Sequence, residues 1–123
     1  MYEIGKNATV STIVSEKNTA KTVGSGSLDV FSTPMMIALM EQAACECLSD
    51  GLEQGQTSVG TNINIEHKAA SPINSKITAT ATIQNIDGRK ISFYVSANCA
   101  EIEIGNGTHT RAIVNAQKFM SRC

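Results

Sequence analysis

Among the side chains of this sequence that carry reactive groups are the hydroxyl of Thr33, the carboxylate of Glu41 and the imidazole of His67. Such groups act as nucleophiles and as general acids or bases. Each residue also has a structural alternative, because Thr33 could cap a helix, Glu41 could face solvent and His67 could simply pack. Glu41 is the least expected of the three, since a carboxylate in an apolar stretch is costly to bury without a partner.

The segment that carries Glu41, Ser32–Asp50, has the pattern of a helix. Ser32 or Thr33 suits its N-cap, Pro34 its first turn and Gly51 its C-cap. One face repeats apolar residues at helical spacing, namely Met36, Leu39, Met40, Ala43 and Cys47. The other faces are also largely apolar, with Met35, Ile37, Ala38 and Ala44. This predicts a helix that is buried on nearly every side, with Glu41 in apolar surroundings.

The spacing of the candidates limits how they can meet. Thr33 and Glu41 are eight residues apart, which on a helix is roughly 12 Å along the axis and about 80° around it. The two side chains of one chain are therefore not expected to reach the same carbonyl group. If both act, we expect a site at a dimer interface that combines residues from two subunits.

Most of the remaining chain alternates in the manner of β-strands. The predicted strands are Asn7–Val14, Thr57–Glu66, Lys76–Ile86, Lys90–Ala97 and Glu103–Phe119. Asp87-Gly88 predicts a hairpin, and Gly105 with Gly107 predicts a bulge or bend rather than a strand end. Thr19–Asp29 is expected to be a loop. The expected inward faces are Val59, Thr61, Ile63 and Ile65, then Ile77, Ala79, Ala81 and Ile83, then Ile91, Phe93, Val95 and Ala97.

This order of elements predicts an α+β protein in which a curved antiparallel sheet wraps around one long central helix, the hotdog fold. The length of 123 residues suits one domain, 1–123. Such a sheet shields only part of the helix, so we expect a homodimer or a dimer of dimers.

The composition argues against several classes of partner. The net charge is −1, Lys and Arg are scattered, and aromatic residues make up only 4%, so we expect no nucleic-acid binding and no membrane association. The longest apolar run, Pro34–Met40, is too short to span a bilayer. Cys45 and Cys47 diverge on a helix and no CxxC occurs, which indicates reduced thiols in a cytoplasmic protein. Neither a metal-ligand motif nor a phosphate-binding glycine loop is present, so we expect no metal and no bound cofactor.

Four ordered segments resemble one family: VFSTPMMIALMEQAA, SVGTNINIEHKAASP, DGRKISFYVSA and EIGNGTHTRAIVNAQKF. Together they are similar to the fluoroacetyl-CoA thioesterase group of hotdog thioesterases, over roughly Val30–Phe119, about three quarters of the chain. The resemblance implies an acyl-CoA thioesterase that cleaves a small or medium acyl-CoA to the free acid and CoA. It implies Thr33, Glu41 and His67 as catalytic residues and Gly60 close to the thioester. CoA would be part of the substrate rather than a cofactor.

Two residues in Thr-His-x-Arg have open roles. Arg111 matches a family arginine and is expected either to be buried and paired or to bind a CoA phosphate. His109 is interpreted as structural, with lining of the cleft as its alternative. The sequence also departs from the family, because Val23–Asp29 is shorter than the family's aromatic-rich lid and only Phe31 has a counterpart there. Thioesterase chemistry is thus expected without fluoroacetyl selectivity.

Two other functions fit the same fold. A non-catalytic hotdog module that binds acyl-CoA is the main alternative, although the three polar positions are all kept. A hydratase or dehydratase of this fold would place an Asp five residues before a His, and neither His67 nor His109 has one. We therefore favour the thioesterase.

Overall fold

The computed structural model describes residues 2–123, so Met1, the first residue of the predicted domain, lies outside the described part of the chain. Its helices and strands follow the predicted order. They are β1 (Asn7–Ile13), α1 (Ala20–Val23), α2 (Thr33–Leu48), the 3₁₀ turn η1 (Ser49–Gly51), β2 (Gln56–His67), β3 (Lys76–Asp87), β4 (Lys90–Cys99), β5 (Ile102–Asn115) and α3 (Ala116–Met120).

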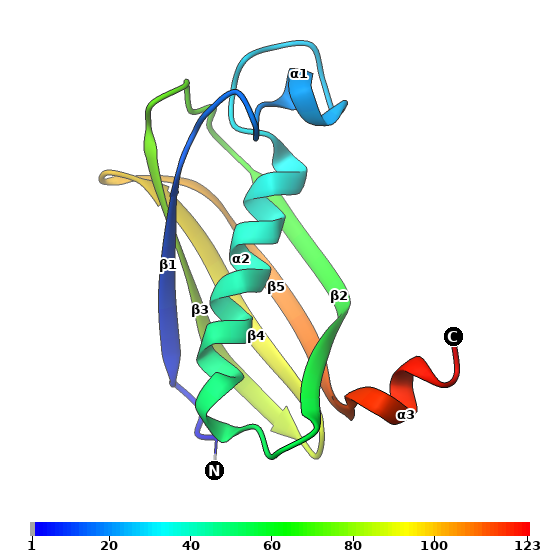
Figure 1. Ribbon diagram of the computed structural model, residues 1–123. Helices are drawn as coiled ribbons and strands as arrows, with labels where there is room; N and C mark the ends of the chain where they lie inside the picture. Colours follow the sequence, from blue (N-terminus) through cyan, green and yellow to red (C-terminus); the bar gives the residue numbers. More distant parts are fainter. Residues whose placement is uncertain (1) are drawn as a thin grey trace.

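The five strands form one antiparallel sheet in the order β1-β3-β4-β5-β2. The sheet curves around α2, with β1 along one flank of the helix and β2 along the other (Figure 1). This arrangement confirms the α+β hotdog fold. β2 pairs only with β5, so its outer edge has no strand partner among residues 2–123.

The core lies between α2 and the concave side of the sheet. The predicted inward faces of β3 and β4 are confirmed, since Ile77, Ala79, Ala81, Ile83, Ile91, Phe93, Val95 and Ala97 are at most 1% exposed. The helix contributes Met36, Leu39, Met40, Ala43, Ala44, Cys47 and Leu48. Burial on nearly every side of α2 was a wrong prediction for the single chain, because Met35, Ala38 and Cys45 are exposed. One sheet covers only one side of a helix.

Two local predictions before and after α2 are also wrong. The segment predicted as a loop contains α1, because the Thr19 side chain accepts a hydrogen bond from the Thr22 N–H and so caps a short helix. Helix α1 ends at Gly24, whose φ of 80° suits glycine. Gly51 does not cap α2, since the chain continues from the helix directly into η1.

β5 differs from its prediction at its end and agrees with it in the middle. The strand stops at Asn115 rather than Phe119, because the Asn115 side chain accepts from the Lys118 N–H and caps α3. The pairing of β4 with β5 shifts just before Gly105, which confirms an irregularity there. A Cβ at Gly105 would lie 2.7 Å from the Met36 sulfur, so the glycine lets α2 approach the sheet closely.

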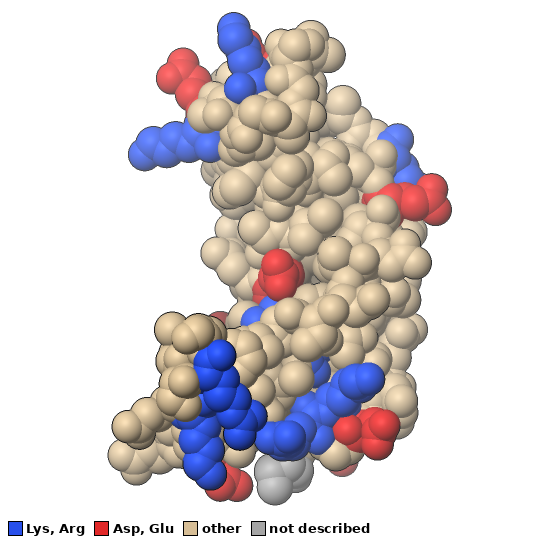
Figure 2. Space-filling model, turned by 90° about the vertical axis from the view of Figure 1, so that its right-hand side faces the viewer, with Lys and Arg blue, Asp and Glu red and all other residues tan. Residues whose placement is uncertain are grey.

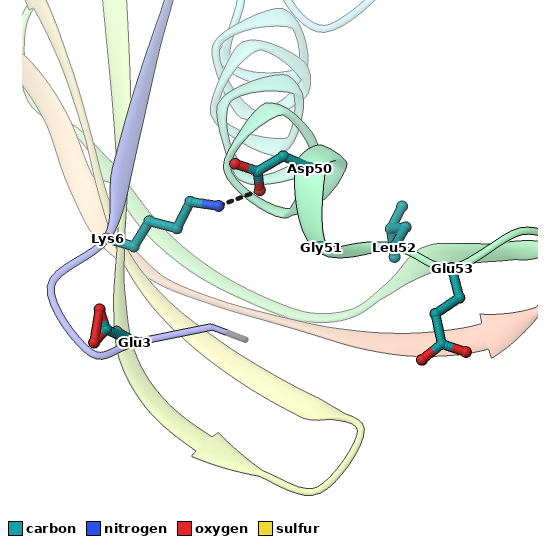
Figure 3. Close-up of a pocket in the computed structure, with 6 residues that line it drawn as sticks. All are labelled: Glu3, Lys6, Asp50, Gly51, Leu52 and Glu53. Carbon is teal, nitrogen blue, oxygen red and sulfur yellow. Dashed lines mark hydrogen bonds and ion pairs between the residues drawn. The ribbon is translucent and has the colours of Figure 1, made fainter.

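An open hollow lies between the segment that precedes β1 and the segment that follows α2. Lys6 reaches across it to form an ion pair with Asp50, while Glu3 and Glu53 point away from that pair (Figure 3). The hydrogen bond from Lys6 lowers the pKa of Asp50. Because the pair is exposed, it adds little to stability. None of the predicted site residues lines this hollow.

The described cysteines and helices bear on two further expectations. All four cysteines are unpaired: Cys45 and Cys123 are exposed, Cys47 is buried and Cys99 is partly buried. Between residues 2 and 123, no helix has the length and apolar character needed to cross a membrane.

Candidate active site

A bulge in β2 turns two candidate residues, Gly60 and His67, toward α2. They are seven residues apart, so strict alternation would place them on opposite faces of the sheet. The pairing of β2 with β5 shifts between Gly60 and Asn62, which leaves Thr61 as an extra residue. This extra residue reverses the alternation once, so that both Gly60 and His67 contact the helix side.

The same bulge corrects the predicted inward face of β2. Ile63 and Ile65 pair with residues on the helix side of β5 and keep the predicted orientation. Val59 and Thr61 do not: before the bulge the inward position belongs to Ser58, whose hydroxyl accepts a hydrogen bond from buried Arg111, and Thr61 is itself the exposed extra residue. Sequence alternation alone does not reveal a one-residue insertion of this kind.

The Thr33 hydroxyl lies 2.8 Å from Nδ1 of His67, at the start of α2. Ser32 caps the helix, since its side chain accepts from the Met35 N–H. The capping alternative for Thr33 is therefore wrong, and its hydroxyl is free to pair with the imidazole. The positive end of the helix lies beside this pair and favours negative charge there.

The imidazole of His67 is held neutral and has one unused nitrogen. Burial lowers the pKa of His67, and the nearby backbone of Ala69 partly offsets this effect. Nδ1 faces Thr33, whereas Nε2 is buried and has no hydrogen-bond partner among residues 2–123. A buried polar atom without a partner is costly, so Nε2 is the atom of this pair whose hydrogen-bonding capacity is unused.

A hollow of about 220 Å³ opens beside Thr33 and His67. Its walls come from α1, from the chain that enters α2 and from the chain that leaves β2, and most of them are small or apolar: Ala20, Ser25, Val30, Phe31, Ala69 and Ala70. Phe31, the predicted lid counterpart, is only 2% exposed. The hollow has room for a small group next to the hydroxyl and imidazole.

Glu41 lies in a second cluster, where Nη1 of Arg111 donates to its Oε2 at 3.0 Å. Arg111 is 6% exposed and also donates to the hydroxyl and carbonyl oxygens of Ser58. Of its two open roles, the structure thus gives Arg111 the buried and paired one. The apolar surroundings predicted for Glu41 are wrong, since its side chain is 41% exposed and meets a guanidinium. Its Oε1 makes no hydrogen bond within residues 2–123.

His109 packs against Arg111 in this cluster, as its structural interpretation predicted, and it also lines the adjoining hollow, which was the alternative. It is 1% exposed and stacks on Phe93 with ring centroids 6.1 Å apart. Its Nδ1 donates to the Asn62 carbonyl at 2.8 Å, so Nε2 is unprotonated and accepts from Arg111 at 3.2 Å. Burial, and secondarily the Arg111 charge, lower the pKa of His109 and keep it neutral. Glu41 therefore pairs with Arg111 rather than with an imidazolium.

Gly60 provides the surface on which the Glu41 carboxylate rests. A Cβ at this position would stand 2.5 Å from Oε2 of Glu41 and 3.2 Å from Cε1 of His109. Only bare backbone leaves room for the carboxylate in this position. A hollow of about 260 Å³ lies over the cluster and extends along β2 to Ile63.

Within one chain the candidates thus form two clusters, Thr33 with His67 and Glu41 with Gly60 and Arg111. No hydrogen bond or ion pair joins the clusters among residues 2–123. Both belong to the side of the molecule that carries β2, which is hollowed and largely uncharged between its two ends (Figure 2). Residues 2–123 contain no group of three His, Cys, Asp or Glu placed to hold a metal ion.

Sequence reasoning missed Ser58 and Asn62, which hold the Glu41 cluster in place. A partial signal was present for His109, since it precedes Arg111 by two residues and so shares its face of a strand. No pattern in the sequence pointed to Ser58 or Asn62, because the bulge between them changes which residues of β2 face α2.

A hydroxyl–imidazole pair at the start of the central helix and a carboxylate farther along it, inside this fold, define a hotdog protein of the thioesterase class. Residues 14–117 match the family described as fluoroacetyl-CoA-specific thioesterase. The chain belongs to this family and is a thioester hydrolase.

Two relatives and one more distant structure illustrate the similarity. The fluoroacetyl-CoA thioesterase of Streptantibioticus cattleyicolor is 40% identical over 94 residues, which are 76% of this chain and 68% of that protein. A single-residue variant of the fluoroacetyl-CoA-specific thioesterase, crystallised with fluoroacetate and CoA, has 34% identity and a TM-score of 0.91, covering 96% of this chain and 99% of its own. A Thermus thermophilus thioesterase superfamily member, at 23% identity and a TM-score of 0.89 over 98% of this chain and 90% of its own, shares the fold.

Proposed function

We propose that this protein hydrolyses a short-chain acyl-CoA to the free acid and CoA, with Thr33, Glu41 and His67 as its reacting groups. The observation that carries this proposal is the 2.8 Å pair of Thr33 with neutral His67, whose second nitrogen has no partner. The relative crystallised with fluoroacetate and CoA supports acyl-CoA as the substrate class. CoA belongs to the substrate, and no separate cofactor is proposed.

The acyl group is proposed to enter the hollow beside Thr33 and His67. At about 220 Å³, with Ala20, Ala69 and Ala70 among its walls, the hollow suits a group of a few carbon atoms. Its aromatic lining residue is Phe31, and Val23–Asp29, where the resemblance implies an aromatic-rich lid, contains no aromatic residue. We therefore propose activity toward several short acyl groups rather than selectivity for fluoroacetyl.

The complete site is proposed to form across a homodimer, because each chain separates its two clusters. The outer edge of β2 is unpaired, and Ile63 on that strand is 40% exposed. Antiparallel pairing of two β2 strands would bring the His67 end of one toward the Gly60 end of the other. Thr33 and His67 of one subunit would then face Glu41 of its partner.

The proposed reaction uses the free atoms of each cluster. Oε1 of Glu41 takes a proton from water as the water oxygen bonds to the thioester carbon, and collapse of the tetrahedral intermediate breaks the C–S bond. Thr33 donates its hydroxyl hydrogen to Nδ1 of His67, which leaves the ring proton on Nε2. Nε2–H then donates a hydrogen bond to the departing sulfur, and the thiolate takes the proton that Glu41 removed from water, so that the carboxylate and the neutral imidazole are both regenerated.

Thiol release from a series of acyl-CoA substrates of increasing chain length tests this function. We expect hydrolysis of the short members, and a fall in kcat of about 10²- to 10⁴-fold in Glu41→Gln and in His67→Asn. Thr33→Ser should keep most of the activity that Thr33→Val loses, because it keeps the hydroxyl. Exposed Lys17→Ala serves as the matched control and should retain wild-type turnover.

Two outcomes would contradict the proposal in different ways. Wild-type turnover in Glu41→Gln would remove that residue from the chemistry. Binding of acyl-CoA by calorimetry, with no thiol released over hours, would instead identify a non-catalytic acyl-CoA-binding module.

A further inference from the structure

Three basic residues gather where distant parts of the chain meet, at the end of the molecule that carries α3. Arg89 lies in the β3–β4 hairpin, Lys118 lies in α3, and Arg122 follows it. Together with Phe119 they line an open hollow of about 380 Å³. Figure 2 shows Lys and Arg side chains concentrated at the lower end of the β2 side, the end where Figure 1 places α3.

The positive charge of this basic hollow is not compensated. None of Arg89, Lys118 and Arg122 forms an ion pair among residues 2–123, and no carboxylate lines the hollow. The chain as a whole has a net charge of −1, so composition does not explain such a concentration. Backbone hydrogen bonds fix the segments that carry it, since the Ile113 N–H donates to the Arg89 carbonyl.

The strand register relates this hollow to the Glu41 cluster. Asn115, in the hollow, pairs with Gln56, while Gly60 pairs with Arg111. The four residues from Gln56 to Gly60 span about 13 Å at the usual strand rise, whereas His67 of the same chain is about 36 Å away. A ligand that reaches from the hollow to the Glu41 cluster must therefore be long, with its anionic end remote from the reacting bond.

We propose that the basic hollow binds the adenosine phosphates of CoA while the thioester lies at Glu41. Arg89, Lys118 and Arg122 would contact phosphate oxygens, for which guanidinium and ammonium groups are suited. Phe119 is 40% exposed and would stack on the adenine ring. This inference rests on the proposed function and names the part of the chain that recognises the CoA end of its substrate.

The experiment compares one acyl group on two carriers, CoA and pantetheine, which lacks the nucleotide. In the double variant K118A/R122A we expect KM for the acyl-CoA to rise about tenfold at low salt, with kcat unchanged. The difference from wild type should shrink in high salt, because the contacts are exposed charges. The matched control K17A/K76A removes two exposed lysines that do not line the hollow and should leave both substrates unaffected.

Calorimetry with adenosine 3′,5′-bisphosphate provides a second readout that does not depend on hydrolysis. The wild-type protein should bind it, and K118A/R122A should bind it at least about tenfold more weakly. An equal change in KM for both carriers, or bisphosphate binding that the variant leaves intact, would overturn the inference. Binding of inorganic phosphate as tightly as the bisphosphate would also overturn it. If no acyl-CoA is hydrolysed, the proposed function fails. The calorimetry with the bisphosphate would still show whether the basic hollow binds the nucleotide.

Discussion

The two carboxylate oxygens of Glu41 are not equivalent. Oε2 accepts from Arg111 and rests on Gly60, whereas Oε1 is free within the described chain. Arg111 is in turn held by Ser58, so the carboxylate is anchored through one oxygen and available through the other. Such an arrangement fixes the position of the carboxylate and leaves Oε1 free to accept a proton, which suits the activation of water.

Gly60→Ala tests whether Gly60 serves only to position this carboxylate. The added methyl would stand 2.5 Å from Oε2, so Glu41 must move, and we expect kcat to fall about 10- to 100-fold. In a Glu41→Ala background the same change should cost less than about a further twofold, because the carboxylate that must otherwise move is gone and the nearest remaining atom, Cε1 of His109, is 3.2 Å away. Kinetics of the two single variants and the double variant measure this coupling. Fully additive losses would contradict the positioning role.

A second residue-scale prediction concerns pH and stability. Burial lowers the folded-state pKa of His67 below its ordinary value of 6.5, so the unfolded chain takes up that proton first as pH falls. The free energy of unfolding should therefore decrease as pH drops below about 6.5, until the folded pKa is reached. Urea unfolding between pH 8 and 5 measures this dependence. His67→Asn should show a shallower decline, and an unchanged slope would contradict the pKa shift.

Residue types and spacing predicted much of the site but not its contacts. The remoteness of Thr33 from Glu41 within one chain agrees with what helix geometry led us to expect, whereas that geometry did not predict the contact of Thr33 with His67. The Arg111 partner of Glu41 could not be predicted from the residues, because the two are seventy positions apart and meet only through the sheet register.

At the scale of elements, β2 decides whether the site can exist. One strand carries both Gly60 and His67 toward α2, and the extra residue Thr61 makes their odd separation compatible with one face. The Thr61 side chain itself is exposed, and its hydroxyl donates only to the Thr110 carbonyl at 3.3 Å. Thr61 therefore acts through its backbone, as the extra residue of the bulge, and not through its side chain.

Deletion of Thr61 should abolish activity by returning β2 to strict alternation. Either Gly60 or His67 would then turn away from α2, and we expect kcat/KM to fall at least about 100-fold. Thr61→Ala keeps the backbone and should retain activity within about threefold. Circular dichroism and urea unfolding establish whether the deletion variant is folded. A folded deletion variant with wild-type activity would contradict the role of the bulge.

Sequence patterns predicted the faces of some strands correctly but misplaced the end of the last one. Alternation identified the inward faces of β3 and β4 because β3 up to Ile83, and β4 from Ile91 to Ala97, are buried at every second residue. It extended the last strand to Phe119, since nothing in a β-like pattern reveals that the Asn115 side chain will cap a helix. Capping depends on a single local hydrogen bond, which propensity describes poorly.

For the whole molecule, complementation between inactive chains tests the composite site. One chain carries Thr33→Ala with His67→Ala, and the other carries Glu41→Ala. After denaturation, mixing and refolding, half of randomly formed dimers are mixed and hold one intact site of two, so about a quarter of wild-type activity should return. Sedimentation confirms that dimers form. If the mixture stays as inactive as its components, the site does not combine residues from two subunits.

The unpaired edge of β2 affects how the rate of hydrolysis depends on the concentration of the protein. If that edge both joins the subunits and completes the site, a chain on its own hydrolyses nothing. Turnover per chain would then be constant at high concentration and would decline on dilution below the point of dissociation. The amount of protein in a cell would set a threshold for catalysis rather than a proportional response.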